Sequence, residues 1–157
     1  MQERSVIHST FVIERNYPAS PERVFNAFSN PASKRRWFIE SANHTVEQYD
    51  LDFRVGGKES ACVRFKPGSP LEGVTCTNDT FHLDIVPNRR VVIVSSMYIG
   101  DKRISASLST IELLPAGTGT DLVFTHQGAF FEGADGPAMR QEGWRKLFDR
   151  LSAELQN

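Results

Sequence analysis

The sequence lacks any long uninterrupted apolar run. No stretch of its 157 residues approaches the ~18 consecutive apolar residues from which a membrane-spanning helix is built. The first ten residues, MQERSVIHST, also lack the apolar centre of a secretory signal peptide. We therefore expect a cytoplasmic protein without stable membrane insertion.

The sequence also carries little net charge. Its 18 Lys and Arg residues are balanced by 19 Asp and Glu residues, which leaves a formal charge of −1 at pH 7. Proteins that bind the phosphate backbone of nucleic acids normally present a basic surface. We therefore expect no nucleic-acid partner.

Motifs typical of metal, nucleotide and hydrolase sites are missing. The four histidines, His8, His44, His82 and His126, lie apart, without an HxH or HExxH pair. The sequence has no GxSxG, no phosphate-binding loop and no GxGxxG, and the Gly-Thr-Gly at 117–119 indicates a hairpin turn. We expect no metal site, no cofactor, and neither nucleophilic nor nucleotide chemistry.

Cysteine is scarce. Cys62 and Cys76 flank the loop 67–70 almost symmetrically, so they could lie opposite each other on neighbouring strands. Two such thiols in a cytoplasmic protein are normally reduced and fill space. We expect free thiols, with a disulfide as the less favoured alternative.

The strongest periodic pattern lies near the C-terminus, in residues 136–155. Its apolar residues follow the i, i+3, i+4, i+7 spacing of one helix face and are Trp144, Leu147, Phe148, Leu151 and Leu155. Asp135 is suited to cap the helix, and Pro137 to occupy its first turn. The pattern predicts a helix over 137–155. A helix of this length spans roughly 28 Å, enough to cross a small sheet.

Most of the preceding chain predicts β-structure. Segments rich in β-branched and aromatic residues are separated by Gly, Pro and Asn turns, at 5–15, 45–53, 59–66, 74–86, 91–99, 103–114 and 120–129. Two short helices are expected after the first strand, one beginning at Pro21 with Ser20 as its cap and one over 31–37. The order predicts a single α+β domain over 1–157, with a curved antiparallel sheet of six to seven strands wrapped on the long C-terminal helix.

One glycine interrupts the predicted C-terminal helix. Gly143 lies beside Trp144 in its interior. A glycine at such a position costs about 1 kcal/mol relative to alanine. Either the strands approach the helix closely there, which is the commoner reason, or space is left for another molecule.

Short motifs along the chain occur in the order and spacing of a known superfamily. They are Glu14-Arg15, the ASPERVF at 19–25, Asn30-Pro31, Trp37, the DFRVGG at 52–57, the DIVPNRRV at 84–91, the GTDL at 119–122 and the EGW at 142–144. With these residues the chain resembles the SRPBCC superfamily, which includes START lipid-transfer domains and birch-pollen-allergen-like proteins. It is most similar to bacterial, polyketide-cyclase-like homologues of the C-terminal domain of the heat-shock-protein-90 ATPase activator. The resemblance implies a helix-grip fold.

The resemblance also implies a cavity between the sheet and the C-terminal helix that binds a hydrophobic or aromatic small molecule. The opening is expected where the short helices meet the loop 127–136. Aromatic and polar residues expected near it, or facing inward on the strands, are Trp37, Phe38, Phe53, His82, Tyr98, His126, Phe130, Phe131 and Trp144.

Two alternatives to ligand binding are open. A polyketide cyclase or dehydratase would need acid–base groups in the cavity, for which His126, Glu59 and Tyr98 are the candidates. A co-chaperone that activates a heat-shock ATPase is less favoured, because the family's eukaryotic members use a further N-terminal domain and this sequence begins at the predicted fold. We expect a non-enzymatic binding protein, for which exposed strand edges make a homodimer reasonable.

Overall fold

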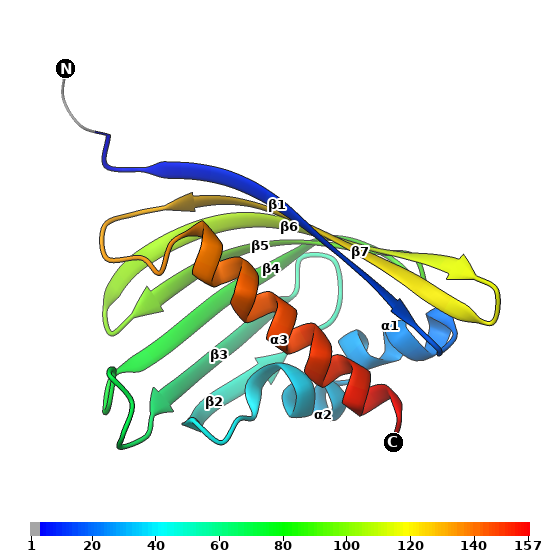
Figure 1. Ribbon diagram of the computed structural model, residues 1–157, viewed down its shortest axis with the longest axis horizontal. Coiled ribbons are helices and arrows are strands. Elements are labelled where there is room, and N and C mark those ends of the chain that lie inside the picture. Colours follow the sequence, from blue (N-terminus) through cyan, green and yellow to red (C-terminus); the bar gives the residue numbers. More distant parts are fainter. Residues whose placement is uncertain (1–3) are drawn as a thin grey trace.

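The computed structural model describes residues 4–157, in which one antiparallel sheet curves around a long helix (Figure 1). The sheet has seven strands: β1 (Ile7–Tyr17), β2 (His44–Leu51), β3 (Lys58–Phe65), β4 (Thr75–Val86), β5 (Arg90–Ile99), β6 (Lys102–Ala116) and β7 (Gly119–Phe130). Their spatial order is β1-β7-β6-β5-β4-β3-β2, so only β1 is displaced from chain order. The predicted helix-grip architecture is confirmed.

The helices are α1 (Pro21–Ser29), α2 (Pro31–Lys34), a π-helical turn (Arg35–Ile39) and α3 (Pro137–Leu155). The predicted start of α1 is correct, because the Ser20 hydroxyl accepts a hydrogen bond from the Arg23 N–H at 3.1 Å. The side chain of Asn30 caps α2 in the same way. No helix within residues 4–157 combines the length and apolar character that crossing a membrane requires.

The start of α3 differs from the prediction. Gly136, with φ of 90°, occupies the N-cap position, and no side chain caps the helix. Asp135 instead accepts two hydrogen bonds from the Arg140 guanidinium, at 2.8 and 2.9 Å. The predicted Asp135 cap is therefore wrong, because the cation one turn into the helix holds the carboxylate.

The two cysteines do not face each other. In the β3–β4 ladder Cys62 pairs with Thr77, and Val63 pairs with Cys76. Because successive side chains alternate between the faces of a sheet, this offset of one residue places the two thiols on opposite faces. Both cysteines are free. The expected opposition is wrong, and the expectation of free thiols is confirmed.

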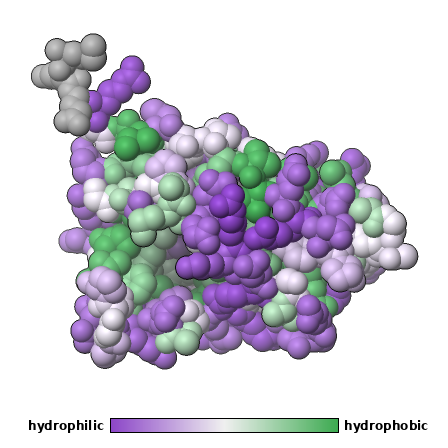
Figure 2. All heavy atoms as spheres, viewed as in Figure 1, coloured by the Kyte–Doolittle hydropathy of each residue, from purple (hydrophilic) through white to green (hydrophobic). Residues whose placement is uncertain are grey.

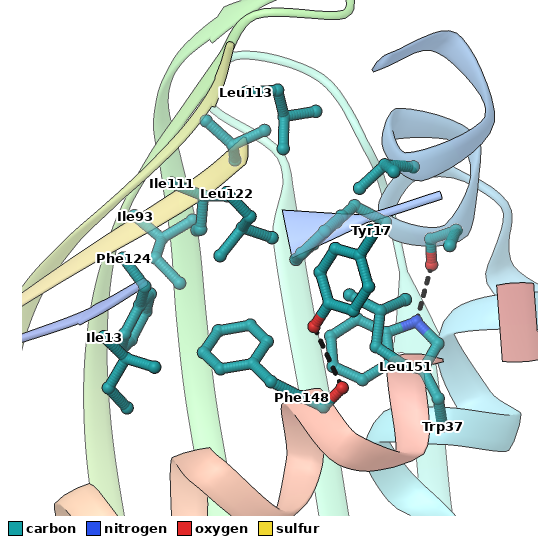
Figure 3. Packing of buried hydrophobic residues seen from close by; sticks show 14 of the residues in the cluster. Ile13, Tyr17, Trp37, Ile93, Ile111, Leu113, Leu122, Phe124, Phe148 and Leu151 are labelled. Carbon is teal, nitrogen blue, oxygen red and sulfur yellow. Dashed lines mark hydrogen bonds between the residues drawn. The ribbon is translucent and has the colours of Figure 1, made fainter. Parts of the chain in front are cut away.

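The hydrophobic core lies between the C-terminal half of α3 and one end of the sheet (Figure 3). Phe148 and Leu151 of the helix pack with residues such as Leu122 and Phe124 of β7, and all four are fully buried. The Tyr17 hydroxyl donates a hydrogen bond to the Phe148 carbonyl at 2.9 Å, which fixes the helix to β1 (Figure 3).

A buried carboxylate holds the end of α3. Glu154 accepts hydrogen bonds from the Arg36 guanidinium at 2.7 Å and from the Ser33 hydroxyl at 2.8 Å. Arg23 of α1 donates to the Glu154 carbonyl at 3.2 Å. The hydrogen bonds and the charge of Arg36 hold the pKa of Glu154 below its usual value. The last turn of α3 is therefore anchored to α1, α2 and the π-helical turn.

The packing of Phe148 gives a testable expectation. Phe148→Ala should lower the free energy of unfolding by about 3–5 kcal/mol, because the ring is 0% exposed and its loss leaves a cavity. The control is Met139→Ala on the same helix, where the side chain is 68% exposed and a change below about 0.5 kcal/mol is expected. Urea unfolding measures both. Equal losses would show that α3 does not grip the sheet through its C-terminal half.

Candidate functional site

A cavity of about 320 Å³ lies between the N-terminal half of α3 and the concave face of the sheet. Gly143 lines it, and a Cβ placed on this glycine would meet nothing within 4 Å. The close-packing explanation of Gly143 is therefore wrong, and the glycine borders open space. Figure 2 shows hydrophobic residues gathered beside the mainly hydrophilic outer side of α3.

The floor of the cavity is a row of small polar residues that runs straight across the sheet. Successive strand pairings connect Ser107, Ser95 and Thr80, from β6 to β4, and lead on to Glu59 of β3; all four line the cavity. The hydroxyls of Thr80 and Ser95 are hydrogen-bonded at 2.7 Å. The floor therefore offers hydroxyl groups to whatever occupies the cavity.

The neighbouring rows differ in chemistry. One adjacent row contains His126, Ser109, Ile93 and His82, and the other contains Phe130, Ser105, Met97 and Asn78. Towards the core the rows become apolar, with Phe124, Ile111, Val91 and Ile85 in register. The polar part of the concave face is therefore the part that α3 does not pack against.

Aromatic rings form the walls. Trp144 of α3 packs against Phe124 at 4.4 Å between ring centroids and against Phe38 at 5.6 Å. On the opposite wall, Phe53 and His82 meet edge to face at 5.1 Å. Each pair lies within the range in which aromatic rings attract one another.

A buried ion pair closes one side of the cavity. The Lys34 ammonium lies 3.2 Å from the Glu59 carboxylate, and their side chains are 9% and 4% exposed. The Tyr49 hydroxyl donates to the same carboxylate at 2.6 Å, and both burial and Glu59 raise the pKa of Tyr49 well above its usual value. Lys34 also lies 4.4 Å above the Phe38 ring. Glu59 is therefore fully engaged by a cation and a neutral phenol.

A second polar cluster lies on the other side. Arg140, held by Asp135, donates to the Ser105 hydroxyl at 3.0 Å and lies 5.0 Å from the centre of the Phe130 ring. His126, only 1% exposed, stacks on Phe11 at 4.6 Å. Within the described chain, its Nδ1 atom has no hydrogen-bond partner. Burial first, and the charge of Arg140 second, lower the pKa of His126 to about 4, so its ring is neutral at pH 7.

The cavity contains most of the residues predicted to line it. Those present are Trp37, Phe38, Phe53, His82, His126 and Trp144, together with Glu59. Tyr98 follows Met97, which lines the cavity, and therefore alternates to the other face of the sheet, where Arg103 donates to its hydroxyl at 2.7 Å. Phe130 is buried behind the cavity against His126, and Phe131 follows the end of β7 outside the lining.

Sequence reasoning missed the polar residues of the site. They are Lys34, Asn78, Thr80, Ser95, Ser105, Ser107, Ser109, Asp135 and Arg140. One signal was present in β6, where serines at alternate positions 105, 107 and 109 give way to Ile111 and Leu113. Such a change along one face of a strand indicates where core packing ends.

Comparison with known proteins gives the family. A family model described as activator of Hsp90 ATPase homolog 1-like protein matches residues 18–156. The chain belongs to this family. The family resemblance inferred from the sequence motifs is thus confirmed.

Proteins of known structure share the whole fold. A protein from Rhizobium loti is 48% identical, with 96% of this chain and 99% of that chain covered and a TM-score of 0.84. A protein from Rhizobium leguminosarum is 37% identical, with 99% of both chains covered and a TM-score of 0.90. An AHSA1-like protein from Aeromonas hydrophila, 20% identical, has the same fold over 94% of this chain and 92% of that chain, with a TM-score of 0.68. A search of proteins with curated functions gave no match.

The buried imidazole of His126 predicts a pH-dependent stability. His126 binds a proton near pH 6.5 when exposed but only near pH 4 when folded. The contribution of this neutral ring to the free energy of unfolding is therefore complete above pH 6.5. It is lost as the pH falls towards 4, by up to about 3 kcal/mol. His126→Leu should flatten this part of the pH profile of unfolding relative to the unmodified protein. A profile unchanged by the substitution would contradict the burial of a neutral ring.

Gly143 yields a second expectation. Gly143→Ala should raise the free energy of unfolding by up to about 1 kcal/mol, because the added methyl group meets open space and alanine favours the helix. Lys146→Ala, an exposed position of the same helix, is the matched control and should change little. Destabilisation by Gly143→Ala in thermal unfolding would show that close packing, not open space, explains the glycine.

Proposed function

We propose that this protein binds a small, largely apolar, ring-containing molecule between α3 and the concave face of its sheet. The observation that supports this function is the cavity of about 320 Å³, walled by aromatic rings and bordered by a glycine. Sites for small molecules are typically concave, mostly apolar and ~300–1,000 Å³ in volume, with a few polar groups that orient the ligand. The observed cavity fits this description.

The energetics favour an apolar occupant. Removing apolar surface from water stabilises a complex by roughly 25 cal/mol per Å². Trp144 and Phe38 provide rings that stay partly buried in the free protein and gain contacts from a ligand. The hydroxyl row of Ser107, Ser95 and Thr80 then distinguishes one orientation of the ligand from another.

Ligand binding is better supported than catalysis of the cyclase or dehydratase type. Acid–base catalysis requires positioned groups close to the reacting atoms. Glu59 lies on β3 and is engaged by Lys34 and Tyr49, whereas His126 lies on β7, four strand positions away. At ~4.8 Å per strand this separation is roughly 19 Å along the sheet. The third candidate, Tyr98, lies on the other face.

A role as an activator of a heat-shock ATPase, suggested by the family description, is the alternative. Such a role would depend on the outer surface and not on the cavity. Stimulation of an Hsp90-type ATPase that survives filling of the cavity would favour this alternative. Our proposal places the binding protein in the cytoplasm, where two free cysteines are usual.

Binding can be tested directly. Native mass spectrometry of freshly purified protein should reveal a co-purified small molecule. Titration with the apolar dye N-phenyl-1-naphthylamine should quench the fluorescence of Trp37 and Trp144, the two tryptophans of the chain, because both line the cavity. Ser107→Leu, which fills the floor, should weaken dye binding by at least about tenfold.

The neighbouring residue provides a matched control. Ala106→Leu adds a larger side chain to the same strand but on the opposite face, so it should leave dye binding unchanged. If the unmodified protein binds no dye and carries no molecule, the proposed function is wrong. Equal dye affinity in both variants would place the binding site elsewhere.

A further inference from the structure

The side of the cavity next to β7 contains a buried polar group whose hydrogen-bonding capacity is unused. Nδ1 of His126 has no partner within residues 4–157, although the ring is 1% exposed. Buried polar atoms are nearly always hydrogen-bonded, and one that is not destabilises the free protein. His126 forms part of the cavity lining, and a bound molecule that displaces the side chains covering Nδ1 can supply the partner.

The ring of His126 is held in a defined position. Phe11 stacks on it with an angle of 8° between the planes, and the rings of Phe124 and Phe130 lie 6.1 and 6.2 Å away. A Cβ on Gly128 would come within 2.9 Å of the imidazole, so the glycine makes room for the ring. A ligand therefore meets an imidazole that is already oriented.

The charges around His126 select against ionised groups. Arg140 is the neighbouring cation, and Asp135 holds it through two hydrogen bonds. A carboxylate on the ligand would compete with Asp135, and an ammonium group would be repelled by Arg140. The cluster as a whole is close to neutral, which favours a neutral polar group.

A hydroxyl group fits these requirements. In a neutral imidazole one nitrogen donates and the other accepts, and a hydroxyl can accept from the first or donate to the second. It therefore satisfies Nδ1 in either tautomer, whereas an ionised carboxylate can only accept. Ser109, which pairs with His126 in the β6–β7 ladder and also lines the cavity, adds a further hydroxyl beside it.

We propose that the natural ligand is a neutral hydroxylated ring compound, such as a phenol or a ring-bearing alcohol, whose hydroxyl group hydrogen-bonds to His126. The inference rests on the proposed function and specifies its ligand class. The ring body of the ligand occupies the part of the cavity walled by Trp144 and Phe38.

The test compares three probes of similar size on the intact protein: 2-naphthol, 2-methylnaphthalene and 2-naphthoate. Calorimetric titration should show 2-naphthol binding at least about tenfold more tightly than the other two, because only its neutral hydroxyl satisfies the imidazole. His126→Leu should remove this preference while leaving the affinity for 2-methylnaphthalene within about threefold. Nitrogen NMR of the ring should report a shift at His126 on addition of 2-naphthol.

A second histidine of the same cavity provides the control. Nδ1 of His82 is already hydrogen-bonded to the Gly57 carbonyl at 2.9 Å, so His82→Leu should leave the preference for 2-naphthol intact. The preference of the unmodified protein is measured independently of whether either variant folds.

The outcomes separate the two proposals. Equal affinities of the unmodified protein for 2-naphthol and 2-methylnaphthalene would overturn the hydroxyl inference and leave cavity binding in place. Tighter binding of 2-naphthoate would overturn the argument from charge and with it the inference. Failure of all three probes to bind would contradict the proposed function itself.

Discussion

The structure depends on the contact between a straight helix and a curved sheet. α3 is a rod that packs most tightly where its C-terminal half meets β1, α1, the π-helical turn and the core, through Phe148, Leu151 and the hydrogen bond from Tyr17. Glu154 holds the same end against Arg36 and Ser33. Since a straight rod cannot follow a concave surface along its whole length, its other end stands away from the sheet. The cavity is a geometric consequence of this grip.

Much of the fold could be predicted, because it is encoded locally. The spacing of apolar residues in 137–155 defines a helix, and the turn residues between the strands define a meander. The cap of α3 could not be predicted in the same way. Asp135 has the right chemistry for a cap, but Arg140 competes for its carboxylate once the loop is folded. Whether Asp135 caps the helix or binds Arg140 is decided by contacts that form only in the folded chain.

The site could be predicted in part for a related reason. The aromatic walls follow from large apolar side chains near the short helices and on α3. Strand alternation decides the rest. Tyr98 is absent from the cavity because it directly follows Met97 and so lies on the other face of β5. The Lys34–Glu59 pair joins residues from α2 and β3, and neither residue alone indicates burial. Lysine side chains are normally exposed, and the burial of Lys34 is explained only by its ion pair with Glu59, which is distant in the sequence.

The polar rows of the concave face are separate from the rows that form the core. Ser105 and Ser107 of β6 line open space, whereas Ile111 and Leu113 on the same face of that strand carry the packing against the helices. Substitutions on the floor therefore change the shape and polarity of the cavity without unpacking the core. Descendants of one ancestral chain can therefore diverge in the lining of this cavity through single mutations while each intermediate still folds. Such a division between the residues that fold the chain and those that line the cavity makes the scaffold readily evolvable.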